Sequence, residues 1–555
     1  MCGIFAMLFA DRQFCFQFYE KHIKELLANR GPNDLKTLYE NSIFFGNSVL
    51  WHQGESLVSL PIYINGSDKI LLFNGDLFME IDGSDTLYVV ELLKNAQNEM
   101  DLIRIFKNIA GPFSMIFYFD KSLYFIRDSF GRNSLIIGKV NDSLFLTSVL
   151  DHQNEVIEAI EIPPLGLYKI NLQTKNVELF PYEGLTHPYH IEQLNFINNI
   201  ISVDLREQVI QPDWLHLKQP STSLSFKDID LPENSENIFE FLLSNEAYSK
   251  LSDEFISILT KSVKYRVSKT QSECKNCIGN NNCNHSNISV LFSGGVDCTL
   301  LTVLAHKFID KRKPIDLLNV AFERVSNKNA NIDFNVPDRL TGLETLNELQ
   351  NLYPERKWNF IEINITRVEL YKHRKKLSSL VYPLSNVLDE SLGSAIYFAS
   401  RGIGLLNGET YESPCRVILI GSGADELFAG YTRHSNAFKR STAEQDLLTK
   451  ELELDWIRLP SRNLARDDRV VADNGVTVRA PFIEESFVNF ARSLKALQRC
   501  YPKLQQGIGD KLLLRLCAFK IGLENCCRFR KRAMQFGSRI ADKKQSAKDK
   551  SQLLK

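Results

Sequence analysis

A strand-like run that ends in a turn of small residues is the feature that most constrains the fold of this chain. Residues 288–292 read Ile-Ser-Val-Leu-Phe, a Ser-Gly-Gly turn occupies 293–295, and residues 297–308 have a helical pattern. This order points several backbone N–H groups at a helix N-terminus, where they can surround an anion. No lysine follows the glycines, so the turn is not the Gly-x-x-x-x-Gly-Lys-Ser/Thr nucleotide loop. The pattern indicates a phosphate site rather than an ordinary tight turn.

Strand-like and helical runs alternate through residues 251–540. This alternation predicts an α/β domain built on a parallel, doubly wound sheet. A second glycine-rich turn starts at Gly421, directly after the strand-like run 416–420. Ligands of such sheets bind beyond the carboxyl ends of the strands. We therefore expect the turns at Gly294 and Gly421 to face one crevice.

The first part of the chain has a different pattern. Residues 1–185 contain short β-type runs separated by turns, with helical stretches at 16–28 and 86–95. This pattern predicts an α+β domain of stacked sheets. Residues 186–250 are polar with scattered prolines and predict a linker with short helices. A basic tail, 541–555, ends the chain and is expected to be solvated.

Composition narrows the possible surroundings of the protein. The 555 residues suffice for several domains, and a formal net charge of −1 gives no bulk attraction to nucleic acid or membranes. No stretch reaches the roughly 20 apolar residues of a membrane span. The eleven cysteines are odd in number and scattered, which is typical of a reducing compartment. We expect a cytoplasmic protein without a membrane or nucleic-acid partner.

Cys2 is a candidate nucleophile at the start of the chain. If Met1 is removed, the free α-amine of Cys2, with a pKa near about 7.7–8.0, can accept the proton of its own thiol. A lone cysteine is more often a small buried apolar side chain, so Cys2 alone indicates little. Together with a phosphate turn, it suits a protein that frees ammonia at one site and uses ATP at another.

Several ordered motifs resemble those of the glutamine-dependent asparagine synthetases. The resemblance spans nearly the whole chain except the linker, an insert near 270–287 and the tail. The motifs are Met-Cys-Gly-Ile at 1–4, Arg-Gly-Pro at 30–32, Asn-Gly-Asp at 74–76, Ser-Asp-Thr at 84–86, Arg-Asp-x-Phe-Gly-Arg at 127–132, Ser-Gly-Gly-Val-Asp at 293–297, Gly-Ser-Gly-Ala-Asp-Glu-Leu-x-Ala-Gly-Tyr at 421–431 and Gly-Asp-Lys-Leu-Leu-Leu-Arg at 509–515.

For the first domain, the resemblance implies an N-terminal-nucleophile glutamine amidotransferase. Cys2 would attack the side-chain amide of L-glutamine, and the Asn74 side chain with the Gly75 N–H would form the oxyanion hole. Asp85 would hold the α-ammonium of glutamine. Without Cys2, a hairpin turn would be the preferred interpretation of Asn74-Gly75.

For the second domain, the resemblance implies an ATP pyrophosphatase that adenylylates L-aspartate or another carboxylate. Asp297 and Asp425 would bind Mg²⁺, and Lys511 would neutralise charge on the α-phosphate. Helix capping by Asp425 and a solvated Lys511 are the plain alternatives. The residues expected to bind ATP and pyrophosphate are Leu291, Ser293, Gly294, Gly295, Val320, Gly421 and Ser422.

Two positions depart from the family pattern. Gln53 stands where the family usually has an arginine that grips the glutamine α-carboxylate, a loss of about 1.5–3 kcal/mol that predicts weak glutamine binding. His52 could compensate only if protonated. Ser422 replaces a glutamate thought to act as base in amide formation, and losing a general base typically costs about 10²–10⁴-fold in rate. Adenylylation is therefore expected to survive better than transfer to ammonia.

The insert and the tail add two weaker signals. Four possible zinc ligands lie in the insert: Cys274, Cys277, Cys283 and His285. The Cys-x-x-Cys pair is typical of one half of a zinc site, but one residue between Cys283 and His285 is short for the other half, so a divergent surface loop is the preferred interpretation. In the basic segment after Arg528, residues 531–539 are expected to close over nucleotide, and contact with RNA is a weak option.

Three function classes remain open at this stage. The first is a glutamine-hydrolysing, ATP-dependent amidotransferase with internal ammonia transfer, which could act as a homodimer. The second is a nucleotide-binding scaffold with impaired catalysis, favoured by Gln53 and Ser422. The third is a tRNA-thiolating ATP pyrophosphatase, since those enzymes also combine a Ser-Gly-Gly-x-Asp turn with Cys-x-x-Cys; the N-terminal glutamine domain argues against it.

Overall fold

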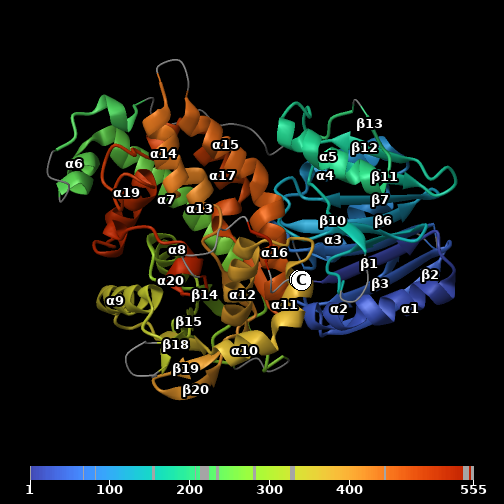
Figure 1. Ribbon diagram of the computed structural model, residues 1–555, viewed down its shortest axis with the longest axis horizontal. Helices are drawn as coiled ribbons and strands as arrows, with labels where there is room; N and C mark the ends of the chain where they lie inside the picture. Colours follow the sequence, from blue (N-terminus) through green and yellow to red (C-terminus); the bar gives the residue numbers. More distant parts are fainter. Residues whose placement is uncertain are drawn as a thin grey trace.

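The computed structural model describes residues 2–541 and 549–551, apart from 65, 67, 82, 153–156, 207, 213–223, 233–236, 279–282, 326–331 and 443–445. The chain forms two halves that lie side by side (Figure 1). We call residues up to 205 the N-terminal half, which is blue to blue-green in the figure. Residues from 238 onward form the C-terminal half, which runs from green to red.

Two stacked sheets form the N-terminal half. The first sheet has six antiparallel strands in the order β10 (Glu158–Glu161), β8 (Ile136–Val140), β9 (Ser143–Thr147), β1 (Gly3–Leu8), β3 (Ile43–Val49) and β2 (Asp34–Glu40). The second has seven strands in the order β13 (Val203–Leu205), β12 (Val177–Pro181), β11 (Gly166–Asn171), β7 (Ser122–Arg127), β6 (Phe113–Phe119), β5 (Lys69–Gly75) and β4 (Ile62–Ile64).

Alternating side chains of β1 explain why the sheets stack. Ile4, Ala6 and Leu8 face the core between the two sheets, whereas Phe5 and Met7 lie in a second core with helix α1 (Arg12–His22). This is the period of two that any strand imposes. The remaining helices of this half are α2 (Lys24–Arg30), α3 (Asp85–Lys94), α4 (Glu99–Asn108) and α5 (Pro188–Ile200).

The layers confirm the predicted stacked-sheet α+β arrangement and show where part of the expected linker lies. Helices α3 and α4 cover the outer face of the second sheet, and α5 packs against the core between the sheets. Strand β13 pairs in parallel with β12. Residues 188–205 are thus structural parts of the N-terminal half.

The C-terminal half contains one seven-stranded sheet, and it is mixed rather than purely parallel as expected. Two antiparallel edge strands, β20 (Glu409–Glu412) and β19 (Ile403–Leu406), form a hairpin beside the parallel strands. A short hairpin at the edge needs no crossover helix, so it can extend a parallel sheet. The parallel strands follow in the order β18 (Trp358–Ile365), β15 (Ile315–Phe322), β14 (Ile288–Leu291), β21 (Val417–Leu419) and β22 (Thr477–Arg479).

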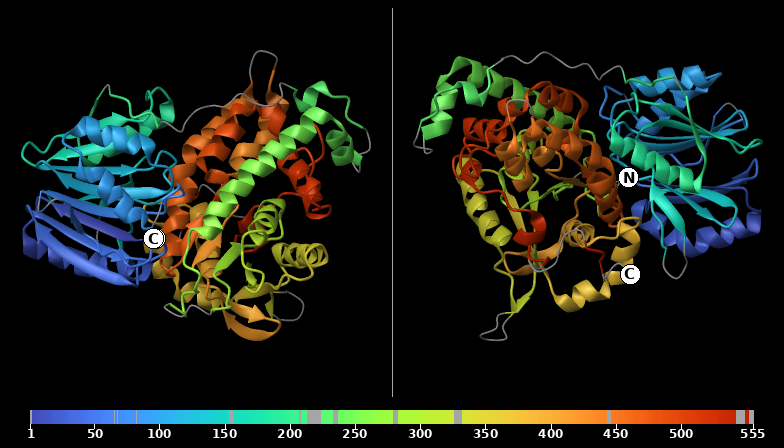
Figure 2. Two further views of the ribbon diagram at one scale, coloured as in Figure 1. Left: turned by 180° about the vertical axis from the view of Figure 1, so that it is seen from behind. Right: turned by 45° about the horizontal axis from the view of Figure 1, so that its top comes forward.

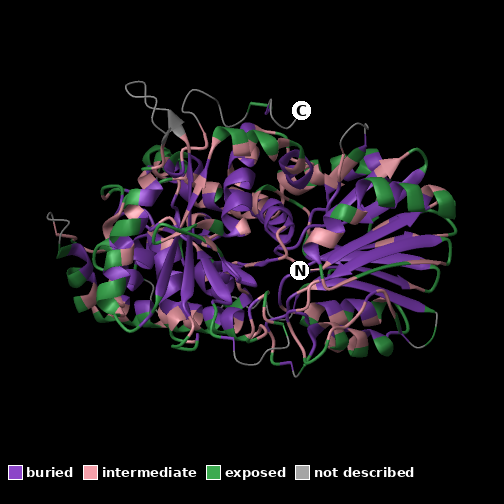
Figure 3. Ribbon diagram, turned by 90° about the horizontal axis from the view of Figure 1, so that it is seen from below, coloured by how far each residue is buried: buried purple, intermediate pink, exposed green. Residues whose placement is uncertain are grey.

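The parallel strands are doubly wound, as the alternation of elements predicts. One face of the sheet packs on α7 (Glu246–Ser268), α8 (Val296–His306) and α19 (Leu512–Lys520), and the other on α11 (Arg374–Val381), α12 (Val387–Arg401) and α16 (Ala465–Ala472). Helix α7, green in Figure 2, crosses the back of this half. The sheets of both halves are buried, and their helices expose outer faces (Figure 3).

Further helices surround this core. They are α6 (Ile238–Ser244), α9 (Pro337–Leu352), α10 (Arg367–Lys372), α13 (Ala424–Phe428), α14 (Thr432–Arg440), α15 (Leu447–Leu459), α17 (Glu485–Ser493), α18 (Ala496–Arg499) and α20 (Met534–Gly537). A short hairpin of β16 (Arg324–Val325) and β17 (Ile332–Asp333) stands apart from the main sheet.

The two halves share a hydrophobic core and several buried ion pairs. The core joins side chains of β1 and α1 to those of α11, α12 and α16. Asp468 of α16 pairs with Arg30 at 3.0 Å and accepts a hydrogen bond from the Ser134 N–H, also at 3.0 Å. Arg132 pairs with Glu485 of α17 at 2.6 Å. Burying a charge costs free energy unless an opposite charge lies beside it. Each of these buried pairs has one partner in each half, so each stabilises the contact between the halves.

Breaking one of these pairs should destabilise the whole chain. In Asp468→Asn, Arg30 keeps its buried charge but loses the carboxylate that balances it, since the Arg30 side chain is 1 % exposed. We expect the free energy of unfolding to fall by about 3–5 kcal/mol, as for other buried pairs that lose one partner. Urea denaturation followed by tryptophan fluorescence measures this change.

A matched control is Glu20→Gln, which breaks the exposed Glu20–Lys24 pair on the N-terminal half. Exposed pairs contribute at most about 1 kcal/mol. Equal losses in the two variants would contradict the role assigned to the interface.

Candidate active sites

Cys2 lies just before β1 and lines a small cavity at the junction of the halves. The cavity has a volume of about 30 Å³, enough for about two water molecules. Glutamine is larger, so this cavity must widen to admit it. Its lining includes Gln53, Gly75, Asp85 and, from the C-terminal half, Thr477.

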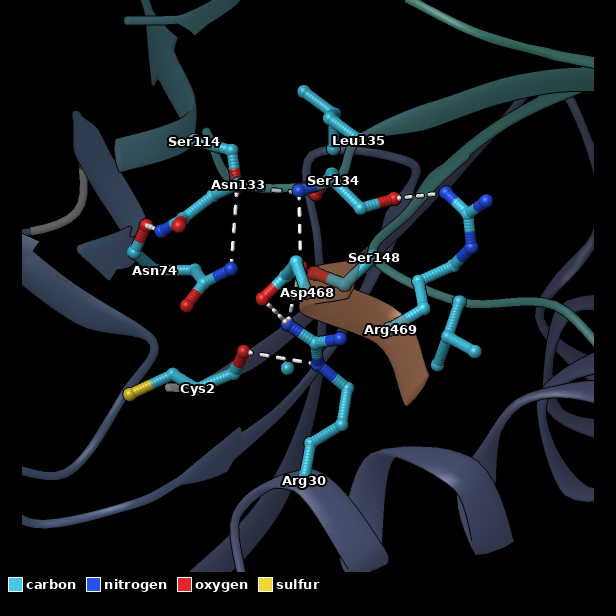
Figure 4. Close-up of polar contacts among 12 residues, drawn as sticks. Cys2, Arg30, Asn74, Ser114, Asn133, Ser134, Leu135, Ser148, Asp468 and Arg469 are labelled. Carbon is cyan, nitrogen blue, oxygen red and sulfur yellow. Dashed lines mark hydrogen bonds and ion pairs between the residues drawn. The ribbon is translucent and has the colours of Figure 1, made fainter. Parts of the chain in front are cut away.

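The Cys2 thiol carries its proton at neutral pH. Burial raises its pKa, the nearby Asp85 raises it further, and Arg30 opposes the shift. A reactive cysteine is usually a thiolate, so this thiol needs a base to become a nucleophile. Its backbone is held by Arg30, whose Nε donates to the Cys2 carbonyl at 3.3 Å (Figure 4).

Asn74 and Gly75 end strand β5 beside this cavity. The Asn74 amide donates to Ser114 Oγ at 3.3 Å, and its backbone carbonyl accepts from Asn133 at 2.8 Å (Figure 4). The side-chain oxygen, Oδ1, is buried without a hydrogen-bond partner. Rotation of the amide would exchange its oxygen and nitrogen. Gly75 thus lies at the cavity. Rotation of the Asn74 side-chain amide would break its long hydrogen bond to Ser114.

Asp85 is a buried carboxylate on the cavity wall. It is the first residue of α3, and it accepts hydrogen bonds from the backbone N–H of Thr86 at 2.7 Å and of Leu77 at 3.4 Å. Burial and the nearby Asp76 raise its pKa to about 6. A cationic ligand group would stabilise the charged form of this carboxylate.

Gln53 is already engaged by a neighbouring carboxylate. Its Nε2 donates to Asp76 at 2.6 Å. Asp76 also accepts two hydrogen bonds, at 2.7 and 3.1 Å, from Arg479 of β22. The remaining Arg479 donors bond the backbone carbonyls of Arg266 and Lys269. An arginine from the other half therefore reaches this wall, but its donors are committed to Asp76 and to backbone.

His52 cannot replace the missing arginine charge. Burial, together with Arg479 and Arg416, lowers its pKa well below the usual value, so the ring is neutral. Its Nε2 lies 2.6 Å from the Thr477 hydroxyl. The condition under which His52 would compensate for Gln53 is not met.

The second candidate site lies where the order of the parallel strands reverses, between β14 and β21. Gly294 has a φ of +77°, and a Cβ there would lie 2.5 Å from the Thr341 carbonyl oxygen. A Cβ on Gly421 would lie 3.0 Å from Cβ of Asp297. The two predicted turns therefore meet at one crevice, at the switch point where sheets of this class bind ligands.

Three of the predicted residues form one charged cluster at this crevice. Lys511 Nζ lies 2.5 Å from a carboxylate oxygen of both Asp297 and Asp425, and Lys531 lies 2.5 Å from Asp425. Burial disfavours the charged lysine, but the two carboxylates raise the pKa of Lys511. Lys511 has a left-handed φ of +56°, which is costly for a lysine and typical of functional positions.

This cluster fits a magnesium ion and phosphate. Asp297 Oδ1 is buried without a hydrogen-bond partner, and a buried unpartnered carboxylate oxygen is an available ligand for a hard cation. Mg²⁺ is usually bound through one or two carboxylates together with substrate phosphates, and Asp297 and Asp425 would be the residues to hold it here.

The other predicted nucleotide residues surround the same strand ends. Leu291 ends β14, and Ser293 and Gly295 follow it before α8. Strand β14 ends opposite Leu318, so Val320 of β15 lies beyond the end of its neighbour, with its side chain buried in the core.

Ser422 stands next to a carboxylate that sequence reasoning missed. Its hydroxyl lies 3.5 Å from Asp467 Oδ2, a long contact. Burial raises the pKa of Asp467, while Arg466, bonded to it at 2.7 and 3.0 Å, opposes the shift. The only local signal was the run Arg466-Asp-Asp-Arg469 in a helix, where four adjacent charges indicate buried pairs.

The hydrogen bond between Arg479 and Asp76 was also not predicted. The two residues are 403 positions apart in the sequence, and only folding brings them together across the junction of the two halves. Lys531, in contrast, belongs to the segment expected to close over nucleotide, and it contacts Asp425.

The Cys-x-x-Cys insert departs from its expected interpretation as a divergent surface loop. The structure brings the ligand atoms of Cys274, Cys277, Cys283 and His285 within 4.8 Å of one another. The cramped Cys-x-His spacing works because the imidazole presents Nδ1, the ring nitrogen nearer its backbone.

None of the helices in the described part of the chain combines the length and the apolar character that crossing a membrane requires.

Comparison with known proteins places the chain in a family. Residues 284–550 match the asparagine synthase family model. An asparagine synthetase domain-containing protein of Drosophila melanogaster is 39% identical over 99% of this chain and 100% of its own length. Asparagine synthetase domain-containing protein 1 of Homo sapiens is 33% identical over 98% of this chain and 95% of its own length.

Among solved structures, the glutamine phosphoribosylpyrophosphate amidotransferase of B. subtilis aligns with 59% of this chain and 68% of its own, with 12% identity and a TM-score of 0.26. A score this low supports no inference. The sequence matches do, because they extend over both halves, and the chain belongs to the family of asparagine synthetase domain-containing proteins.

Proposed function

We propose that this protein is an ATP-dependent, glutamine-hydrolysing amidotransferase of the asparagine synthetase type. The observation that carries the proposal is the meeting of Asp297, Asp425 and Lys511 at the strand-order reversal, between two glycine turns. The Cys2 cavity, which includes Asp85 and Gly75, supplies the second site.

At the N-terminal site, the Cys2 sulfur would form a bond to the side-chain carbonyl carbon of glutamine. The α-amine, free after removal of Met1, takes the thiol proton and passes it to the departing ammonia. Asn74 and the Gly75 N–H stabilise the oxyanion, and water then releases glutamate from the thioester. Because burial raises the thiol pKa, this step depends on the α-amine as base.

At the C-terminal site, the carboxylate of L-aspartate or another acid would attack the α-phosphorus of ATP, and pyrophosphate leaves. The N–H groups around Gly294 and Gly295 bind the leaving phosphates, and Lys511 exchanges its carboxylate partners for phosphate oxygens. Asp297 and Asp425 would hold Mg²⁺, which would supply charge neutralisation there. Ammonia from the first site would then attack the acyl carbon and AMP would leave. Because Ser422 replaces the family glutamate, the proton released from the nitrogen would pass to the departing AMP phosphate or to water.

A second candidate function is a nucleotide-binding scaffold with weak or no amide transfer. Three observations favour it: Gln53 is bonded to Asp76, His52 is neutral, and Ser422 stands where the family has a glutamate. ATP binding without release of ammonia or pyrophosphate, in protein shown to lack Met1, would support the scaffold and contradict the enzyme.

Replacing the nucleophile should separate the two reactions. In Cys2→Ala, we expect ammonia release from glutamine to disappear, while pyrophosphate release persists when ammonium is supplied with ATP and aspartate. A coupled glutamate dehydrogenase assay measures ammonia, and a pyrophosphatase–phosphate assay measures pyrophosphate. Cys15→Ala, a buried cysteine of α1, is the control. Continued ammonia release in Cys2→Ala would exclude this mechanism.

Glutamine binding should weaken in acid because Asp85 must be charged to hold the α-ammonium. Its pKa of about 6 means that the carboxylate is charged above pH 6 and neutral below it. Calorimetric titration of Cys2→Ala protein with glutamine, which avoids thiol titration, should show affinity falling by up to about tenfold per pH unit below pH 6. In Cys2→Ala with Asp85→Asn, binding should be weak and independent of pH. A pH-independent affinity with Asp85 present would refute this role.

Lys511 should matter for chemistry as well as for stability, because it balances two carboxylates at the crevice. We expect Lys511→Gln to lower pyrophosphate release by about 10²–10³-fold, the usual effect of removing one preorganised charge contact to the transition state, in protein that urea denaturation shows to be folded. Lys520→Gln, at the other end of α19 and paired with the exposed Asp253, should keep normal turnover. Equal activity of the two variants would contradict the assignment of Lys511.

A further inference from the structure

The insert between α7 and β14 gathers three thiols and one imidazole around a common point. The ligand atoms of Cys274, Cys277, Cys283 and His285 all lie within 4.8 Å of one another. We propose that this cluster is a structural zinc site, bound by the three cysteine sulfurs and Nδ1 of His285, and that it braces the wall of the Cys2 cavity.

The distances match those of a tetrahedral zinc centre. His285 Nδ1 lies 3.7 Å from Sγ of Cys274, 3.5 Å from Sγ of Cys277 and 3.5 Å from Sγ of Cys283. Zn–S bonds of about 2.3 Å and Zn–N bonds of about 2.0–2.1 Å at tetrahedral angles separate S and N by about 3.6 Å. One ring nitrogen has a single proton or lone pair, so it cannot bond three sulfurs at once. A shared cation explains why all three sulfurs lie at nearly one distance, 3.5–3.7 Å, from this nitrogen.

The donor set selects the metal and its role. All eleven cysteines of the chain, these three included, are free thiols in the structure. Thiolates and imidazole favour zinc over the hard ions Mg²⁺ and Ca²⁺. Three sulfurs and one nitrogen fill the four positions of zinc, which is the closed shell of a structural centre rather than the open shell of a catalytic one.

The surroundings suit the charge of such a centre. Three thiolates around one Zn²⁺ carry a net charge of −1. Arg416, 3 % exposed, lies nearby: burial lowers its pKa, and the negative charges of Glu273, then of Cys274 and Cys283, oppose that shift. Arg416 Nε is buried without a hydrogen-bond partner. This buried guanidinium faces both Glu273 and the cluster, and it adds positive charge beside the thiolates.

The insert connects the cluster to the Cys2 cavity. Gln271, three residues before Cys274, donates through its backbone to the His52 carbonyl at 3.1 Å and through its side chain to the Gly54 carbonyl at 2.6 Å. Arg416 donates to the Trp51 carbonyl at 2.8 Å. These contacts hold residues 51–54, of which 51–53 line the cavity.

The cluster also fixes the strands that carry the nucleotide turns. Lys275 N–H donates to the Pro414 carbonyl at 2.9 Å, just before β21. His285 lies three residues before β14. A metal at this point would tie the starts of both strands on either side of the order reversal.

Metal content of the purified full chain tests the site. Protein expressed with zinc and purified without a histidine tag should contain one equivalent of zinc by inductively coupled plasma mass spectrometry. Cys277→Ser and His285→Ala should each lose most of it. Cys415→Ser is the matched control: this buried cysteine is close in sequence to Arg416 but lies outside the cluster, so its zinc content should equal that of the wild type.

Cobalt gives a second readout that does not depend on stability. Protein refilled with Co²⁺ should show the intense visible bands of tetrahedral thiolate coordination, and Cys277→Ser should weaken their sulfur-to-cobalt charge-transfer component. Wild-type protein with less than a tenth of an equivalent of zinc, or with a disulfide among these cysteines by mass spectrometry, would overturn the proposal. So would full zinc content in both ligand variants.

The bracing role has its own measurement. Removing zinc with a chelator should speed alkylation of Cys2 by iodoacetamide several-fold, measured on the Cys2 peptide by mass spectrometry. Gln271→Ala should produce the same acceleration with zinc still bound. An unchanged Cys2 rate after zinc loss would refute the bracing of the cavity, whatever the protein catalyses.

Discussion

Buried ion pairs across the junction are the contacts on which the arrangement of this protein depends. Arg30–Asp468, Arg132–Glu485 and Arg479–Asp76 each place a charge of one half against an opposite charge of the other. Hydrophobic contact alone would hold the halves together without fixing their registration. Bidentate and charge-assisted bonds demand one geometry. The two candidate sites, which lie in halves with different folds, are therefore held at a fixed relative position.

Much of the fold could be predicted because it rests on local patterns. The short β-type runs separated by turns in residues 1–185 and the turn at residues 293–295 each report a local constraint that the structure satisfies. The antiparallel hairpin β19–β20 was not predicted, although its signal is local: Asn407 and Gly408, both with positive φ, form the two-residue turn that favours a hairpin. Strand β13 was not predicted, because the polar residues and prolines of 186–250 indicated a linker. Tertiary pairing, rather than propensity, decides such elements.

The site residues divide in the same way. The turn at residues 293–295 indicates a phosphate site from local pattern alone, whereas the roles of Asp297, Asp425 and Lys511 were predicted from motifs that resemble those of the asparagine synthetases. Arg479 binds Asp76, 403 residues away, and its neighbours in the sequence do not indicate this contact. Asp467 has a local signal in the charged run 466–469, but its contact with Ser422 depends on the fold. The Cys-x-His spacing favoured a surface loop because it looked too short for both side chains to reach one point. The structure shows that Nδ1, the ring nitrogen nearer the backbone, lets His285 approach Cys283 across this spacing.

The bond from Arg30 to the Cys2 carbonyl has a consequence for how this protein can evolve. The same guanidinium binds Asp468, so the backbone at Cys2 is set by a helix contributed from the other end of the gene. An N-terminal half excised from this chain would lose that anchor, along with Thr477 beside His52. Separating the halves on two genes would therefore change the surroundings of Cys2 even if each fragment folded.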